Sequence, residues 1–432
     1  MKAFEQYKLS NGTRVIIAPQ QDTKAVTTLA YFAVGSRYEP LPLWGGSHFL
    51  EHMMFKGTEK RPTTEDLSKQ LDAVGADYNA FTSKDHTAYY IKMDARHTEL
   101  SLDLLSDMLY KSKFDSAEFE RERGVIVEEL NMYEDNPSMK VEEVFEEHMF
   151  AGNMLGARIG GPVENIKSMV LKDLIAYKKR FYAPEHLVLV LAGKVGKNIR
   201  PLIKKYFGAE KVHNVKQLGY KPFSWTKARR EAPEPVKVMF KETDQMHMVL
   251  GFPAFNYDDP RNAALLLLHV ILGGSMSSRL FIGVRERRGL CYVIRSGVTN
   301  YGDAGAFTIT SGLDKARLAE AMQVIYDELQ VLLKKGVTEE EVRMAKDHLA
   351  GKMVLQFEDS ARVADYLGQQ KLLMNKVETP EEKFARIMKV TAADVNKVAR
   401  EVLVFKNAKM GVIGPYKKAE EFLKAAQLPW LK

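Results

Sequence analysis

Five consecutive residues constrain this chain more than any other stretch. Residues 48–52 read His-Phe-Leu-Glu-His, with the histidines four positions apart and the acid directly before the second histidine. On an α-helix, residues three or four apart share a face, so both imidazoles and the carboxylate would project together. Phe49, Leu50 and Met53 make this helix apolar nearly all round, which predicts that it is buried.

Two imidazoles beside a carboxylate are the groups that a catalytic zinc site needs. Imidazole nitrogens hold Zn²⁺ at about 2.0–2.1 Å, and a nearby carboxylate takes a proton from water. The order is the inverse of the usual His-Glu-x-x-His. The pattern predicts His48 and His52 as zinc ligands and Glu51 as the general base. The alternatives are polar residues on a surface helix and a buried cluster satisfied without metal; with ten histidines in 432 residues, a chance match is a modest risk.

A zinc site of this kind needs a third protein ligand. Residues 116–133 have a helical apolar spacing, and at 100° per residue Glu122 and Glu129 fall inside the apolar arc while Glu128 points away. Buried carboxylates are costly unless a charge meets them, which makes Glu129 the best candidate. The alternative, surface pairing with nearby arginines, suits Glu128 better.

These two segments together closely resemble the pitrilysin family of zinc peptidases, which includes insulinases and mitochondrial processing peptidases. In that family the inverted motif is followed by a ligand Glu on a helix that residues 122–130 match. The resemblance implies that Glu129 is the third ligand, that Glu122 has a supporting, non-ligand role in catalysis, and that one zinc ion binds per chain.

A second resemblance concerns the strand predicted at residues 76–83. In the family an Asn-Ala-x-Thr edge strand lies beside the zinc, and the matching residues here are Asn79, Ala80, Phe81 and Thr82. Such an edge binds extended peptides through main-chain hydrogen bonds. The resemblance therefore implies a substrate-binding strand; the alternative is a plain hairpin.

A third resemblance concerns Arg285 and Tyr292, which have the seven-residue spacing of a family pair that reaches the scissile carbonyl. A cation and a phenol at that place would stabilise developing negative charge. The alternative for Arg285 is a surface salt bridge with Glu286.

The chain also contains an internal repeat. Residues 170–193 are echoed by residues 390–414, at an offset of about 220. We predict an α+β fold of two homologous α/β-sandwich domains: a catalytic domain at residues 1–212, a basic, proline-containing linker at 213–235, and a second domain at 236–432. The offset places His269 near the position of His48, but Leu272 and Gly273 replace the acid and the second histidine. The second domain should therefore bind no metal.

Composition narrows the class of protein. The chain is 45% hydrophobic and 28% charged, which is typical of a globular protein. Its formal charge of +7 is spread along the sequence without a basic motif, so no nucleic-acid partner is expected. No segment has the length of a membrane span. Cys291 is the single cysteine, which excludes an intrachain disulfide, and the first residues show no leader; both favour a cytoplasmic protein.

We therefore expect a zinc endopeptidase that hydrolyses peptides or short unfolded segments. The resemblance implies mostly antiparallel sheets packed with helices, and an enclosed clamshell chamber formed by two such chains. A homodimer is expected first, with Arg285 and Tyr292 serving the partner's zinc. The alternatives are a catalytic subunit that needs a zinc-less homologue and a non-catalytic scaffold.

Overall fold

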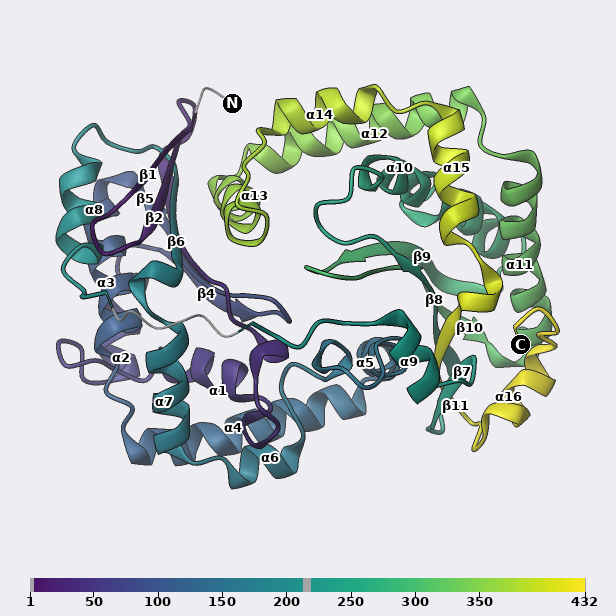
Figure 1. The fold of residues 1–432 in the computed structure, drawn as a ribbon, viewed down its shortest axis with the longest axis horizontal. Helices are drawn as coiled ribbons and strands as arrows, with labels where there is room; N and C mark the ends of the chain where they lie inside the picture. Colours follow the sequence, from purple (N-terminus) through teal and green to yellow (C-terminus); the bar gives the residue numbers. More distant parts are fainter. Residues whose placement is uncertain (1–3, 213–218, 432) are drawn as a thin grey trace. The chain divides into compact units, whose positions relative to one another are not determined.

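The computed structural model describes residues 4–212 and 219–431, which divide into two compact units (Figure 1). The first unit comprises the chain up to Leu130, Arg158–Lys221 and Lys352–Lys383; the second comprises Asn131–Ala157, Pro222–Gly351 and the chain from Phe384. Each unit contains one β-sheet.

The first sheet has six strands and is mostly antiparallel. Its order is β1 (Glu5–Lys8), β2 (Arg14–Pro19), β6 (Leu187–Gly193), β3 (Ala25–Phe32), β5 (Thr87–Asp94) and β4 (Asp77–Thr82), and only the β2–β6 pairing is parallel. The central strand β6 is buried at every residue, which explains its unbroken apolar sequence. The edge strand β4 is largely exposed, apart from Ala80.

Helices cover both faces of this sheet. On one face, α1 (Gly46–Met53), α3 (Thr98–Lys111), α7 (Leu171–Phe181) and α8 (Ile199–Phe207) pack around a buried apolar cluster. The other face is covered by α13 (Ser360–Leu373), whose Val363 and Leu367 pack with Tyr31 and Val190 of the sheet. A Cβ on Gly368 would lie 2.7 Å from the Tyr31 ring, so the close approach of α13 requires a glycine there.

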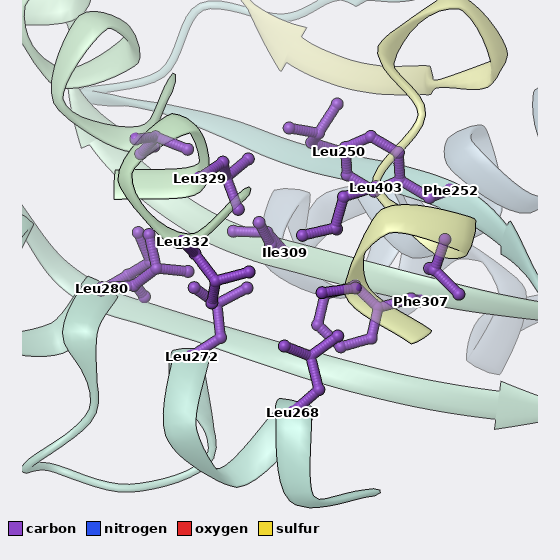
Figure 2. Packing of buried hydrophobic residues seen from close by; sticks show 14 of the residues in the cluster. Leu250, Phe252, Leu268, Leu272, Leu280, Phe307, Ile309, Leu329, Leu332 and Leu403 are labelled. Atoms are coloured by element: carbon purple, nitrogen blue, oxygen red, sulfur yellow. The ribbon is translucent and has the colours of Figure 1, made fainter. Parts of the chain in front are cut away.

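The second sheet has five strands. Its order is β7 (Val236–Phe240), β11 (Lys409–Gly414), β8 (Gln245–Ala254), β10 (Gly305–Asp314) and β9 (Cys291–Asn300), with only β7 and β11 parallel. One face packs against α10 (Asn262–Gly273), α11 (Leu318–Lys335), α15 (Ala392–Val402) and α16 (Ala419–Ala426). Figure 2 shows this core, where Leu268 of α10 approaches Phe307 of the sheet and Leu272 lies beside Leu332. On the other face, α5 (Pro137–Met149) packs its Phe145 against Val249.

The two sheets share one topology. Strands β7, β11, β8, β10 and β9 repeat the order and the directions of β2, β6, β3, β5 and β4, and β1 is an addition to the first sheet. The offset between corresponding strands is about 220 residues, as the sequence repeat predicts. The prediction of two similar α+β units with mostly antiparallel sheets is confirmed.

The boundaries of the compact units differ from the predicted contiguous domains. Helix α5 lies in the first half of the sequence but belongs to the second unit, and α13 lies in the second half but belongs to the first. The compact units are therefore not the ranges 1–212 and 236–432. The reason is physical: helical periodicity shows that a helix has an apolar face, but not which sheet that face covers.

The predicted linker at 213–235 is partly structured. Residues 213–218 lie outside the described residues, whereas α9 (Trp225–Glu231) is helical, and Phe223 and Trp225 pack near Phe150. The remaining helices are α2 (Thr64–Asp72), α4 (Ser116–Asp135), α6 (Val163–Ser168), α12 (Glu339–Phe357) and α14 (Pro380–Met388). Within the described parts of the chain, no helix combines the length and apolar character needed to cross a membrane.

Candidate metal centre

Helix α1 carries the His-Phe-Leu-Glu-His run and is fixed by its apolar side. Phe49, Leu50 and Met53 are buried in the first unit, which leaves the histidines and Glu51 on the more open side. The helix follows Gly45, whose φ of 96° is in the left-handed region. A Cβ on Gly45 would lie 2.5 Å from the Gly160 carbonyl oxygen, so this entry into the helix requires glycine.

The structure brings His48, His52 and Glu129 together. The Nε2 atom of His48 lies 3.5 Å from Glu129 Oε1, and Nε2 of His52 lies 3.4 Å from Glu129 Oε2. One ligand atom from each of these three residues lies within 4.8 Å of the others, and the described residues contain no second cluster of this kind. Glu129 comes from α4, where Glu128 is exposed, as the helical spacing predicts.

Glu122 contacts His52 through the ring nitrogen that does not face Glu129. Its carboxylate is 3% exposed, with Oε2 3.0 Å from His52 Nδ1 and Oε1 2.5 Å from Lys56 Nζ. Burial raises the pKa of Glu122, but the hydrogen bonds with His52 and Lys56 outweigh it and keep the pKa below its ordinary value. An ionised Glu122 accepts a hydrogen bond from the Nδ1–H group of His52, which directs the Nε2 lone pair of that ring towards Glu129.

A cation fits among these groups. With Nδ1–H donated to Glu122, His52 Nε2 and a Glu129 oxygen are two acceptors that face each other at 3.4 Å. Without a cation, a proton must lie between them: burial lowers the pKa of His52, but hydrogen bonds to Glu122 and Glu129 raise it to about 9. The same histidines hold the pKa of Glu129 well below its usual range. Two imidazole nitrogens and one carboxylate are a ligand set used by catalytic zinc, so the residues fit this ion.

Glu51 lies beside the cluster in a mostly buried position. Burial raises the pKa of its carboxyl above the ordinary value, although the hydrogen bond from Thr82 and the two histidines act in the opposite direction. Thr82 Oγ1 donates to Glu51 Oε2 at 2.5 Å. A raised pKa makes this carboxylate a stronger proton acceptor than an ordinary one, which suits a general base.

Strand β4 is the edge strand of the first sheet, as the resemblance implies. Asn79 and Phe81 are exposed along it, whereas Ala80 faces the core. The Ala80 N–H donates to Asn79 Oδ1 at 2.9 Å. Thr82 differs from the other three residues, because its side chain contacts Glu51. Substrate binding by this strand stays a prediction.

Arg285 and Tyr292 lie in the second unit. The Arg285 guanidinium lies 5.0 Å from the centre of the Tyr292 ring, and Tyr292 is 71% exposed. Arg285 also lies 3.9 Å from Glu286. The structure thus brings the pair together on their own unit, and their action at a zinc site stays a prediction. His269 Nδ1 lies 2.8 Å from Ser296 Oγ, which is consistent with a packed, hydrogen-bonded histidine.

Three contacts around the site were not predicted from the sequence, although Thr82 itself was named as part of the substrate-binding strand. Lys56 and Thr82 contact Glu122 and Glu51, and Glu39 accepts backbone N–H groups at the start of α1. Lys56 lies one turn beyond His52, so helical spacing offers a signal for it. For Glu39, which lies in the preceding loop, periodicity offers none.

Comparison with known protein families matches most of the chain. Residues 14–163 match the insulinase family, peptidase family M16, and residues 168–349 match the peptidase M16 inactive domain. An uncharacterized zinc protease of Streptomyces coelicolor is 34% identical over 412 residues, which cover 95% of this chain and 89% of that protein. The beta subunit of the mouse mitochondrial-processing peptidase is 30% identical over 436 residues, which cover 98% of this chain and 87% of that subunit.

Solved structures agree on the fold. A protease from Helicobacter pylori superposes with a TM-score of 0.89 at 23% identity, covering 96% of this chain and 99% of that one. A peptidase M16 inactive domain from Pseudomonas fluorescens superposes with a TM-score of 0.87 at 20% identity, covering 96% and 98%. With the family match and the relatives above, these likenesses lead to one conclusion: the chain belongs to the insulinase family of peptidases, peptidase family M16.

Proposed function

We propose that this protein is a zinc-dependent endopeptidase that hydrolyses peptides or short unfolded polypeptide segments. The observation that carries the proposal is the convergence of His48, His52 and Glu129 on one point, with the Glu51 carboxyl beside them. The comparisons support the proposal, because several relatives are named as zinc proteases.

Each residue has a definite task in this proposal. Bound zinc would supply Lewis acidity, which polarises the scissile carbonyl and acidifies water. His48, His52 and Glu129 would hold the ion, and Glu122 would orient the His52 ring. Glu51 would accept a proton from the attacking water and then donate it to the leaving amine, while Thr82 keeps its carboxyl aimed at the reacting groups.

The substrate class follows from the β4 edge. An extended peptide that pairs with β4 is bound mainly through its backbone, so binding tolerates many sequences and requires an unfolded segment. The Asn79 side chain, which now accepts the Ala80 N–H, would have to move aside when a substrate carbonyl takes that donor.

The partner and the enclosed chamber also belong to this proposal. We expect a homodimer in which Arg285 and Tyr292 of one chain stabilise charge at the zinc site of the other. A catalytic subunit with a zinc-less homologous partner is the second candidate, favoured by the similarity to a processing-peptidase beta subunit. A reducing, cytoplasmic setting suits a chain whose one cysteine is Cys291.

The deciding experiment compares wild type with Glu51→Gln. Both proteins are assayed for bound zinc by elemental analysis, and both digest a mixed peptide library that is read by mass spectrometry. We expect about one zinc per chain in both and cleavage by wild type alone. Glu128→Gln, an exposed carboxylate on α4, is the matched control and should cut normally.

Each other outcome has a clear reading. Cleavage by Glu51→Gln at the wild-type rate contradicts the role of Glu51. Wild type that binds zinc but cuts nothing favours the two-subunit candidate, and addition of a homologous partner chain should then restore cleavage. Wild type that binds no zinc overturns the proposal and favours the scaffold.

A further inference from the structure

The two histidines of the proposed zinc site are supported differently. His52 has a side-chain partner, because its Nδ1 lies 3.0 Å from Glu122. The Nδ1 atom of His48 is buried, and no group among the described residues forms a hydrogen bond with it. The wall near it is backbone: a Cβ built on Gly160 would lie 3.7 Å from His48 Nδ1. Glu129 meets the ring at Nε2 and the His52 ring packs against it, but on its Nδ1 side the orientation of the His48 ring depends on the backbone that carries it.

His48 lies in the first turn of α1, where that backbone is weakest. The first hydrogen bond within the helix runs from the Phe49 N–H to the Gly45 carbonyl, so the N–H groups before Phe49 lack helical partners. The residue before the helix, Gly45, has no side chain to cap them. Fraying of this turn would displace His48 before any other residue of the site.

Glu39 supplies the missing cap. Its Oε2 accepts the Gly45 N–H and its Oε1 accepts the Ser47 N–H, both at 2.7 Å, and the side chain is 4% exposed. Both oxygens are thus used on the turn that carries His48. A second tie comes from α7, where Tyr177 Oη lies 2.9 Å from Ser47 Oγ.

We infer that Glu39 is the positioning residue for His48 and acts through the backbone as Glu122 acts on His52 through the ring. Tyr177 assists by its contact with the Ser47 hydroxyl in the same turn. This inference rests on the proposed zinc site, and it adds that the affinity of that site depends on a loop carboxylate that contacts neither the ion nor its ligands.

The test uses the whole chain loaded with zinc. The variants are Glu39→Ala, Glu39→Gln, which keeps one acceptor oxygen, and Tyr177→Phe. The matched control is Asp66→Asn, because Asp66 accepts the Thr63 N–H at the start of a different helix, α2. Zinc release to a chelator, the visible spectrum of the Co²⁺-loaded protein, and hydrogen exchange in peptides spanning residues 45–53 are measured for each protein.

We expect zinc release to accelerate roughly 10- to 100-fold in Glu39→Ala, less in Glu39→Gln, and least in Tyr177→Phe, in the range seen for partners of metal ligands. The Co²⁺ bands of the Glu39 variants should shift, and exchange should rise within residues 45–53. Asp66→Asn should raise exchange in α2 alone and release zinc at the wild-type rate.

The outcomes separate this inference from the proposed function. If wild type binds zinc and the folded Glu39→Gln and Tyr177→Phe variants release it at the wild-type rate with unchanged Co²⁺ bands, the inference falls and the zinc site stands. If wild type binds no zinc, the proposed function falls and takes this inference with it. If Glu39→Ala does not fold, the other two variants decide.

Discussion

The two sheets have the same strand order, yet the helices at corresponding positions, α1 and α10, serve different purposes. Helix α1 presents His48 and His52 near three carboxylates, whereas α10 has Gly273 at the place of the second histidine. A Cβ on Gly273 would lie 2.5 Å from the Ser296 backbone nitrogen, so α10 packs too closely against β9 for any side chain at that position. The same architecture thus carries a helix with polar side chains in the first unit and a closely packed apolar helix in the second.

The comparison also shows how the proposed metal site changes the packing around its helix. In α1, His52 is partly exposed and the site gathers several carboxylates in a small volume. Ionisable groups at such density need a cation or protons to balance them. In α10 the same region contributes apolar contacts, such as Leu268 and Leu272 (Figure 2). The first unit should therefore depend on metal for part of its stability, and the second unit should not.

Removal of the metal should produce the largest difference in stability between the two units. A ligand present at a thousand times its Kd stabilises the state that binds it by about 4 kcal/mol. Chelation of zinc should lower protection from hydrogen exchange in the first unit, around α1 and α4, and leave the helices that pack in the second unit's core, such as α10 and α11, unchanged. His52→Ala should remove the difference between chelated and loaded protein. Equal loss in both units would contradict the comparison.

Acid should affect both units alike through a pair of buried histidines. His86 lies in the first unit and His148 in the second; burial lowers the pKa of each to about 4, helped at His148 by the charge of Lys409. In the unfolded chain each titrates near 6.5, so between about pH 6.5 and 4 the unfolded state binds more protons. The free energy of unfolding should fall as pH falls through this range, by up to about 3 kcal/mol per histidine.

Matched variants locate this acid dependence. The free energy of unfolding is measured in denaturant from pH 7 to pH 4. His86→Phe should reduce its pH dependence in the first unit only, and His148→Phe should reduce it in the second unit only. A wild-type slope in both variants would show that other groups cause the acid loss.

Two glycines test the packing half of the comparison. Gly273→Ala should destabilise the second unit by about 1–3 kcal/mol, because the new Cβ meets the β9 backbone. Gly46→Ala, in α1, is the control. The nearest atom to the new Cβ lies 3.6 Å away, so this change should be neutral or slightly stabilising. Thermal unfolding of both variants measures the difference, and a neutral Gly273→Ala would show that α10 can shift.

The smallest effects should come from exposed ion pairs. Lys69 with Glu65 in the first unit and Arg343 with Glu340 in the second are highly exposed on both sides. Lys69→Met and Arg343→Met should each change the free energy of unfolding by less than about 0.5 kcal/mol. A larger change in one unit alone, measured in denaturant, would mean that surface charge also distinguishes the units.

Much of the site could be predicted from local spacing. The inverted motif lies on one helix, so 3.6-residue periodicity placed its three groups together, and the same reasoning separated Glu129 from Glu128 on α4. The repeat of about 220 residues predicted the shared sheet topology.

What escaped prediction depends on contacts distant in sequence or outside regular elements. Glu39 lies in a loop with no periodicity, and its role depends on the path that the chain takes before α1. The Thr82–Glu51 hydrogen bond joins residues that meet only when helix α1 packs beside strand β4. The placement of α5 and α13 was missed because an apolar face fits either sheet equally well on sequence grounds.

Helix α13 lies late in the sequence but covers the first sheet, and this has a consequence for synthesis of the protein. One face of the first sheet, with Tyr31, Val188 and Val190, stays uncovered until α13 has left the ribosome, although the last strand of that sheet ends at Gly193. At roughly 5–20 residues per second, this wait lasts on the order of ten to forty seconds. A nascent chain therefore exposes apolar sheet surface while it already contains every residue of the proposed zinc site. The complete first unit can form only when the chain is nearly finished.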